Sequence, residues 1–203
     1  MRALQELSKK VAPAGSAEPR RRYVPPMLAL TSLDGLPAHV FLVHIPVVLI
    51  PLGALGAVLM LWPRMRQMIG WWVCGILVVA GIATQLAIDS GQSLKEYVRE
   101  SALVRDHTRI GENIRPWLLL LFLALVGVMI IDRMLQRPRE PGSPTRDPLR
   151  IVGIGLSVSS IVFAGFSVYW IYRIGHSGSK AVWQPTQTRI DNGVRLRGNH
   201  EGH

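Results

Sequence analysis

The chain has 203 residues, of which 49% are hydrophobic and only 18% are charged, and its mean hydropathy is +0.26. A soluble domain carries about a quarter charged residues, so this composition argues against a soluble enzyme. The net charge of +10 is common in nucleic-acid-binding proteins, but no matching fold or aromatic–basic motif accompanies it. The basic residues instead lie in tails and loops beside apolar blocks, which suits the anionic surface of a lipid bilayer.

Residues 1–36 form a polar arm with scattered proline and glycine and with three consecutive arginines at 20–22. The first apolar run begins too late and is too long for a secretory signal peptide. We therefore expect residues 37–183 to form one membrane domain. Residues 184–203 should then be a polar, mobile C-terminal tail.

Four uncharged apolar blocks lie within the membrane domain, at residues 40–62, 68–88, 116–131 and 151–172. The first would be about 35 Å long as a helix, which is enough to cross the hydrocarbon core. Its internal prolines are tolerated in membrane helices, where neighbouring groups satisfy the freed carbonyls. The sequence therefore predicts an all-α integral membrane four-helix bundle, with the lipid bilayer as its first partner.

The loop at residues 89–115 carries its own helix signals. Gly91 is well placed to cap the second span. Ser93 and Glu96 have the spacing of a capping box, so we expect a short helix on the membrane surface after them. The third block is short, and its helix should begin earlier, near Thr108, with Ile110 and Ile114 buried.

The fourth block has small residues at four-residue spacing, a pattern that lets helix backbones approach closely in lipid. These pairs are Gly153 and Ser157, Gly155 and Ser159, and Ser160 and Ala164. The pattern predicts that this span is the packing centre of the bundle. A Gly155→Leu substitution should then disturb the packing.

Charge asymmetry gives a mixed signal for orientation. The two loops on one side, 63–67 and 132–150, hold seven arginines against three acids, whereas loop 89–115 holds five basic residues against five acids. The positive-inside rule then places both termini and loop 89–115 outside the cytoplasm. The arginines at 20–22 argue the other way, although they lie far from the first span.

Four of the six histidines gather at one end of the predicted bundle. His39 opens the first span, His107 precedes the third and His176 follows the fourth. An even number of crossings places these three on one membrane face. His44 lies about 7.5 Å deeper on the first helix, and Asp89 lies at the same end.

An ionisable residue inside a span indicates a functional site, so His44 is the first candidate, although it could also donate to a carbonyl freed by a proline. His39 and His176 could be interface residues or caps, and His107 a surface residue. His44 and His107 would suit the two axial positions of haem b. Alternatively, the four histidines with Asp89 could bind copper or zinc, or a histidine and an acid could handle the protons of a quinone.

The stretch from Gly35 to Pro46 resembles the opening signature of a bacterial membrane family, domain of unknown function 2231. That signature has two histidines five residues apart, a proline two residues after the second and a four-span layout. The resemblance covers about residues 34–183. This chain has Val40 where the family often has proline, and Ile45 where it often has an aromatic residue.

Two further segments are similar to an actinobacterial-type branch of the family: residues 106–112 and 172–183. The resemblance implies the four-span fold and directs interest to the same four histidines. It implies no activity. Some relatives are joined to redox modules, which favours electron-transfer surroundings.

We therefore expect a small redox-associated membrane protein that holds haem b or another metal through its histidines. The alternative is a non-catalytic accessory subunit of a larger, respiratory-type membrane complex. No catalytic residues are predicted: the chain has no phosphate-binding loop, no nucleophile elbow and no internal repeat of the kind that transporters show. Gln85, Thr84 and the serines of the fourth span are too few polar groups to favour a permease.

Overall fold

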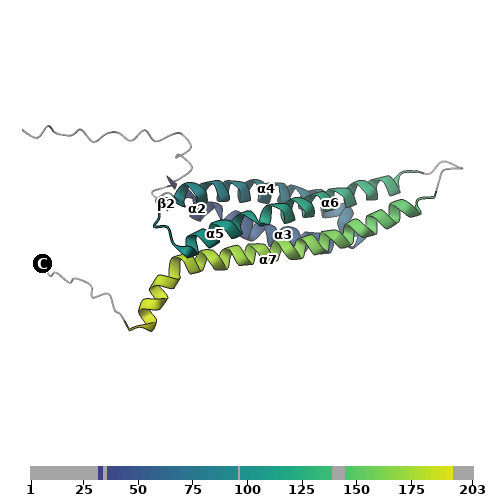
Figure 1. The fold of residues 1–203 in the computed structure, drawn as a ribbon. Helices are drawn as coiled ribbons and strands as arrows, with labels where there is room; N and C mark the ends of the chain where they lie inside the picture. The colour runs from purple at the N-terminus through teal and green to yellow at the C-terminus, as the bar shows by residue number, and fades with distance from the viewer. Residues whose placement is uncertain (1–31, 34–35, 96, 139–144, 194–203) are drawn as a thin grey trace, which may run out of the picture.

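The computed structural model describes residues 32–33, 36–95, 97–138 and 145–193. Within these residues, four helical segments are long and apolar enough to cross a membrane. The fold is an all-α membrane bundle, as the sequence predicts (Figure 1). Its helices are α2 (Ala38–Leu42), α3 (His44–Leu59), α4 (Pro63–Lys95), α5 (Ala102–Glu112), α6 (Ile114–Gln136) and α7 (Asp147–Asp191). Most of the N-terminal arm lies outside the described residues.

The first span consists of two helices, α2 and α3, which meet at Val43. Just before them, the strands β1 (Ser32–Leu33) and β2 (Leu36–Pro37) form an antiparallel pair of two residues each. Pro51 lies inside α3 without ending it. The chain then turns at Met60 and α4 begins at Pro63, so the first two spans form the antiparallel hairpin that their short link requires.

Helix α4 is longer than the sequence predicts. It continues to Lys95, so the predictions that Gly91 caps it and that Ser93 starts a new helix are wrong. Ser93 instead donates a hydrogen bond from its hydroxyl to the carbonyl of Asp89, 3.1 Å away and one turn back. Gly91 therefore lies inside the helix and has no capping role.

The helix before the third span begins at Ala102, earlier than expected. Ser101 caps it by accepting a hydrogen bond from the backbone N–H of Val104 (3.2 Å), the usual role of a serine at this position. The helix is interrupted at Asn113, and α6 starts at Ile114. Ile110 and Ile114 are both buried, as the sequence predicts.

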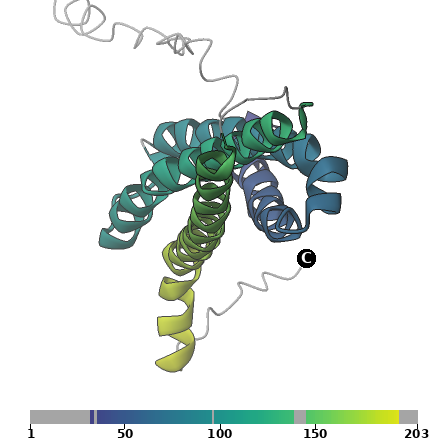
Figure 2. The same ribbon diagram turned by 90° about the vertical axis from the view of Figure 1, so that its right-hand side faces the viewer.

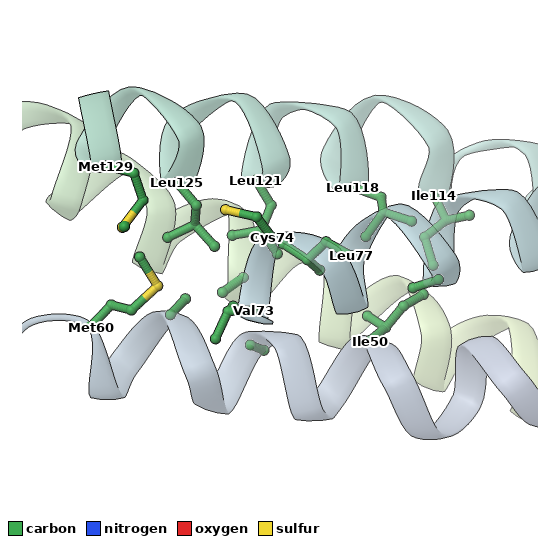
Figure 3. Packing of buried hydrophobic residues seen from close by; sticks show 14 residues of the cluster. Ile50, Met60, Val73, Cys74, Leu77, Ile114, Leu118, Leu121, Leu125 and Met129 are labelled. Atoms are coloured by element: carbon green, nitrogen blue, oxygen red, sulfur yellow. The ribbon is translucent and has the colours of Figure 1, made fainter. Parts of the chain in front are cut away.

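The core lies along the facing sides of α3, α4 and α6 (Figure 3). It contains Ile50 from α3, Leu77 from α4, and Leu121 and Leu125 from α6, all with exposed fractions of 2% or less. Outward-facing residues of the same helices are large and apolar as well; Val48, Ile82 and Leu119 are more than half exposed. A bundle that is apolar on both its inner and outer faces has lipid as its solvent.

Close approach of α3 and α4 depends on two glycines. A Cβ atom added to Gly53 would lie 2.6 Å from Leu77 Cδ2, and one added to Gly56 would lie 2.6 Å from Val73 Cγ2. Neither separation is tolerable, so the branched side chains of α4 pack directly on the α3 backbone. Small residues therefore govern packing in the first hairpin as well as in the fourth span.

Helix α7 packs through only part of its small-residue pattern. Ser160, Ala164 and Ser167 are buried against the bundle, whereas Gly155 is exposed and an added Cβ there would meet nothing within 4 Å. The expectation for Gly155→Leu is therefore wrong, because that position faces away from the other helices. Only 17% of the apolar window of α7 is buried, against 33–39% for the other spans, although the helix packs along α6 and also contacts α3 and α5.

Helix α7 also continues beyond the bundle. It reaches Asp191, so residues 184–191 of the expected C-terminal tail are helical. At 1.5 Å per residue its 45 residues span about 68 Å, more than twice the hydrocarbon core. Its final turns bend away from the bundle axis and extend past the other helices (Figures 1 and 2).

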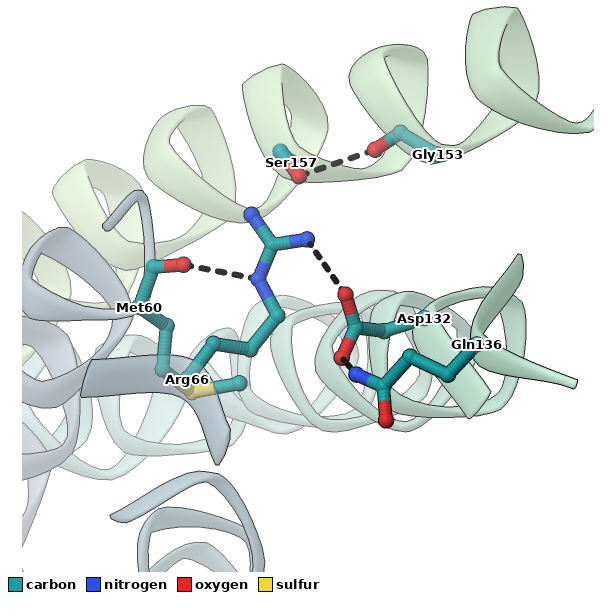
Figure 4. Close-up of polar contacts among 6 residues, drawn as sticks. All are labelled: Met60, Arg66, Asp132, Gln136, Gly153 and Ser157. Atoms are coloured by element: carbon teal, nitrogen blue, oxygen red, sulfur yellow. Dashed lines mark hydrogen bonds and ion pairs between the residues drawn. The ribbon is translucent and has the colours of Figure 1, made fainter. Parts of the chain in front are cut away.

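The end of the bundle where α3 meets α4 is held by one arginine (Figure 4). Arg66 donates a hydrogen bond from Nε to the carbonyl oxygen of Met60, 2.9 Å away. Its Nη1 forms an ion pair with Oδ1 of Asp132 on α6, at 3.5 Å. Gln136 donates to the other oxygen of that carboxylate at 2.6 Å. We call Arg66, Asp132 and Gln136 the arginine cluster.

Candidate functional site

The opposite end of the bundle brings two histidines together. His39 on α2 and His107 on α5 have ring centroids 6.3 Å apart, with the ring planes at 77°. Both side chains are partly buried. They are 68 positions apart in sequence, and they meet because an even number of crossings returns the chain to the same face. We call these two residues the histidine pair.

His39 is anchored to α4. Its Nδ1 lies 2.8 Å from the carbonyl oxygen of Ala87, and the hydroxyl of Ser90 lies 3.5 Å from the same nitrogen. A carbonyl can only accept, so Nδ1 carries a proton, and in the neutral ring the lone pair is on Nε2. This assignment follows from the hydrogen-bond network.

His107 is anchored to α7 in the same way. Its Nδ1 lies 2.9 Å from the hydroxyl oxygen of Ser177, which itself donates to the carbonyl of Ile174 at 3.0 Å. With the hydroxyl proton of Ser177 donated to Ile174, the hydroxyl oxygen accepts from His107 Nδ1. In the neutral ring, this arrangement leaves the lone pair of His107 on Nε2.

Each ring of the histidine pair lies against a helix glycine. An added Cβ at Gly91 would lie 2.9 Å from Cε1 of His39, and one at Gly178 would lie 3.1 Å from Cε1 of His107. A side chain at position 91 would therefore displace the ring of His39, and one at position 178 would require the ring of His107 to shift slightly. This explains a glycine at position 91, inside α4 and about one turn before its end, where glycine otherwise weakens a helix by about 1 kcal/mol.

The other three predicted site residues lie apart from the histidine pair. His44 is exposed, and its Nδ1 donates to the carbonyl of Val40, 2.6 Å away and one turn back. His176 is exposed and stacks on Tyr172 of its own helix, with centroids 5.9 Å apart. Asp89 is exposed and accepts a hydrogen bond from Gln85 at 2.8 Å.

The predicted four-histidine cluster with Asp89 is therefore not assembled. Among the residues that the structure describes, no group of three or more His, Cys, Asp or Glu side chains is placed to hold a metal ion. The expected inward pairing of His44 with His107 also fails, because His44 faces outward near the junction of α2 and α3. The pair that does form uses the shallower histidine of the first span.

The sequence does not predict the four residues that support the histidine pair: Ser90, Gly91, Ser177 and Gly178. The sequence did contain a signal for two of them, since Ser177 and Gly178 follow His176 within a stretch that resembles the family. In this segment the sequence points to His176, because histidine is the more common functional residue, whereas Ser177 and Gly178 are the residues that contact His107. Only the structure shows that its serine and glycine face His107.

Comparison with known proteins supports the architecture. The family model described as "Predicted membrane protein (DUF2231)" matches residues 35–188. The chain belongs to this family. No curated protein and no solved structure matches it. Family membership therefore establishes a membrane protein without assigning a reaction, and the chemistry must be argued from the site.

Proposed function

We propose that this membrane protein binds a first-row transition-metal ion through Nε2 of His39 and Nε2 of His107. The supporting observation is that each Nδ1 is engaged by a protein oxygen, Ala87 O or Ser177 Oγ, at 2.8–2.9 Å. Metal-binding histidines nearly always donate their second ring nitrogen to such an acceptor, which fixes the tautomer and ring orientation. Both rings are thus prepared to offer a lone pair.

Two imidazoles favour copper, zinc, iron or nickel over calcium or magnesium, which prefer oxygen ligands. With two protein ligands, the remaining coordination positions are open to water or a small exogenous ligand, as in catalytic rather than structural sites. Copper or iron in such a site would exchange single electrons, which is the redox role that the histidines led us to expect. The proposal replaces haem b held by His44 and His107, since those two side chains are not brought together.

Metal analysis of detergent-purified, tag-free protein tests the proposal. We expect about one equivalent of a transition metal in the wild type, and its loss in His39→Gln and in His107→Gln. His44→Gln and His176→Gln are matched controls at the same end of the bundle and should keep the metal. Metal retained by both test variants, or absent from the wild type after loading, would refute the site. A Soret band that survives in both test variants would point to haem on other ligands.

A second candidate function is that of an accessory subunit in a membrane complex, and the observation that favours it is the low burial of α7. Its exposed face presents Ile151, Ile154 and Val158 to the membrane, and helices associate in lipid through packing rather than hydrophobicity. Light scattering of the detergent complex distinguishes a lone 22.5 kDa chain from a stable assembly. A metal-free protein isolated in stoichiometric complex with another chain would favour this function.

We also propose that the histidine pair lies on the extracytoplasmic face. The support is the arginine excess of the loops at the other end, since basic loops remain in the cytoplasm. An alkaline phosphatase fused after residue 203 should then be active, and a green fluorescent protein at the same position should be dark. The reverse pattern would place the site inside the cell.

A further inference from the structure

A groove of about 310 Å³ opens on the flank of the bundle between α4 and α6. Its walls are apolar over most of their length and include Leu77, Leu118 and Phe122. The polar residues Thr84, Gln85 and Arg115 lie at one end. From Gln85 to Leu77 the groove follows α4 for about 12 Å at 1.5 Å per residue.

The groove has the polarity of an amphipathic molecule that lies along the helices. Arg115 immediately precedes the uncharged block 116–131, and Gln85 lies within one turn of the end of the block 68–88, so both belong at the level of the lipid headgroups. Leu77 and Phe122 lie deeper, in the hydrocarbon region. An occupant must therefore place an anionic or hydrogen-bonding head at Arg115 and an apolar chain against the walls.

Charge decides the class of occupant. Arg115 is exposed, and within the described part of the chain its side chain makes no hydrogen bond or ion pair. The nearest acid one turn back, Glu112, already accepts a hydrogen bond from Gln92 at 3.0 Å. A guanidinium at this depth binds phosphate with several N–H donors.

The floor of the groove is set by Gly81. This residue lines the groove, and an added Cβ there would meet nothing within 4 Å. No neighbouring side chain requires glycine at this position, so its effect is to leave space on the surface of α4. A larger side chain would fill the place that an apolar chain occupies.

We propose that this groove is a binding site for one anionic phospholipid, with its phosphate on Arg115 and an acyl chain over Gly81 between α4 and α6. Arg115 supplies the preference for an anionic head. The groove supplies retention of the chain. The site is separate from the histidine pair and does not depend on metal binding.

Native mass spectrometry of the full chain, delipidated and re-exposed to equal amounts of phosphatidylglycerol and phosphatidylcholine, tests the site. The wild type should retain one phosphatidylglycerol in preference to phosphatidylcholine. Arg115→Gln should lower that preference about fivefold, the effect of one basic residue near an anionic lipid. Gly81→Leu should remove the retained lipid of either type.

Two matched variants control for charge and for size. Arg109→Gln removes an exposed arginine from α5 at the same end, and Gly155→Leu adds a side chain at another open glycine outside the groove. Both should behave as the wild type. If Arg115→Gln and Gly81→Leu also retain lipid as the wild type does, the proposal is overturned. Equal loss in Arg109→Gln would mean that any arginine at this surface attracts the lipid, which would also overturn it.

Discussion

The two ends of the bundle are built on opposite uses of polar side chains. At one end, Arg66 joins the carbonyl of Met60 to the carboxylate of Asp132, which ties α4 to the end of α3 and to α6. At the other end, His39 and His107 are each tied to a neighbouring helix through one nitrogen only. The first arrangement uses its hydrogen-bonding groups within the protein, whereas the second leaves one lone pair on each ring for another partner.

This difference separates a structural contact from a candidate site. A partly buried charged side chain stabilises a fold only when it has an opposite charge and hydrogen-bond partners nearby. Arg66 and Asp132 meet this condition, because they pair with each other and with Met60 and Gln136. Two neutral imidazoles side by side stabilise little by themselves. Their anchoring by Ala87 and Ser177, and the glycines that make room for them, support the proposed metal site.

The largest expected effect on stability is at the arginine cluster. Arg66→Met removes both the ion pair and the hydrogen bond to Met60, and leaves the carboxylate of Asp132 partly buried with only Gln136 as partner. Side chains that are about 16–17% exposed are partly screened, so we expect a loss of about 2 kcal/mol rather than the larger values of fully buried pairs. Equilibrium unfolding in detergent–denaturant mixtures measures it.

Arg64→Met is the matched control, because Arg64 is exposed and lies two residues before Arg66 in the first turn of α4. It should change the unfolding free energy by less than about 0.5 kcal/mol. Neither variant should change metal binding. Loss of metal in Arg66→Met without unfolding would show that the two ends are coupled, and the division between a structural end and a binding end would be wrong.

A smaller effect, confined to binding, is expected at the histidine pair. Ser177→Ala removes the acceptor that fixes the tautomer of His107, and such supporting contacts typically contribute tenfold or more to metal affinity. We expect the dissociation constant of the metal to rise about tenfold in a competition titration, with little change in thermal stability. Nitrogen NMR of the ring should show a mixture of the two tautomers of His107.

Ser179→Ala provides the comparison two residues further along α7, at an exposed position. It should leave both affinity and tautomer unchanged. If Ser177→Ala binds metal as tightly as the wild type, the hydrogen bond from His107 is an ordinary interhelical contact. The histidine pair would then resemble the arginine cluster in role.

The sequence predicts the spans because their signal is compositional: long uncharged blocks require helices in lipid whatever their neighbours are. It also predicts that His39 and His107 share a membrane face, since this depends only on the number of crossings. It does not predict which side of a helix faces the bundle. His44 and Gly155 were assigned inward positions from chemistry and spacing, and both face outward, because rotation of a helix is set by tertiary packing that an apolar sequence does not reveal.

The same limit explains the errors in α4. Glycine and a capping-box spacing after residue 90 are local signals for a helix end, and they were overridden by contacts with α2 and α5. Gly91 is required by His39, which lies 52 positions earlier in the sequence. A local rule cannot find a contact of that kind.

The smallest expected effect tests this lesson on the flank of α7. Gly153 and Gly155 are two residues apart and lie on different sides of the helix: an added Cβ at Gly153 would lie 3.0 Å from Cγ2 of Ile131, whereas one at Gly155 meets nothing. Gly155→Leu should therefore leave the unfolding free energy within about 0.5 kcal/mol of the wild type. Gly153→Leu should lower it by about 1 kcal/mol or more through overpacking against α6, in the same unfolding assay. If Gly155→Leu lowered the unfolding free energy more than Gly153→Leu, another protein surface would have to cover the Gly155 face of α7 in detergent. That face would then be a protein interface and not a lipid-facing surface.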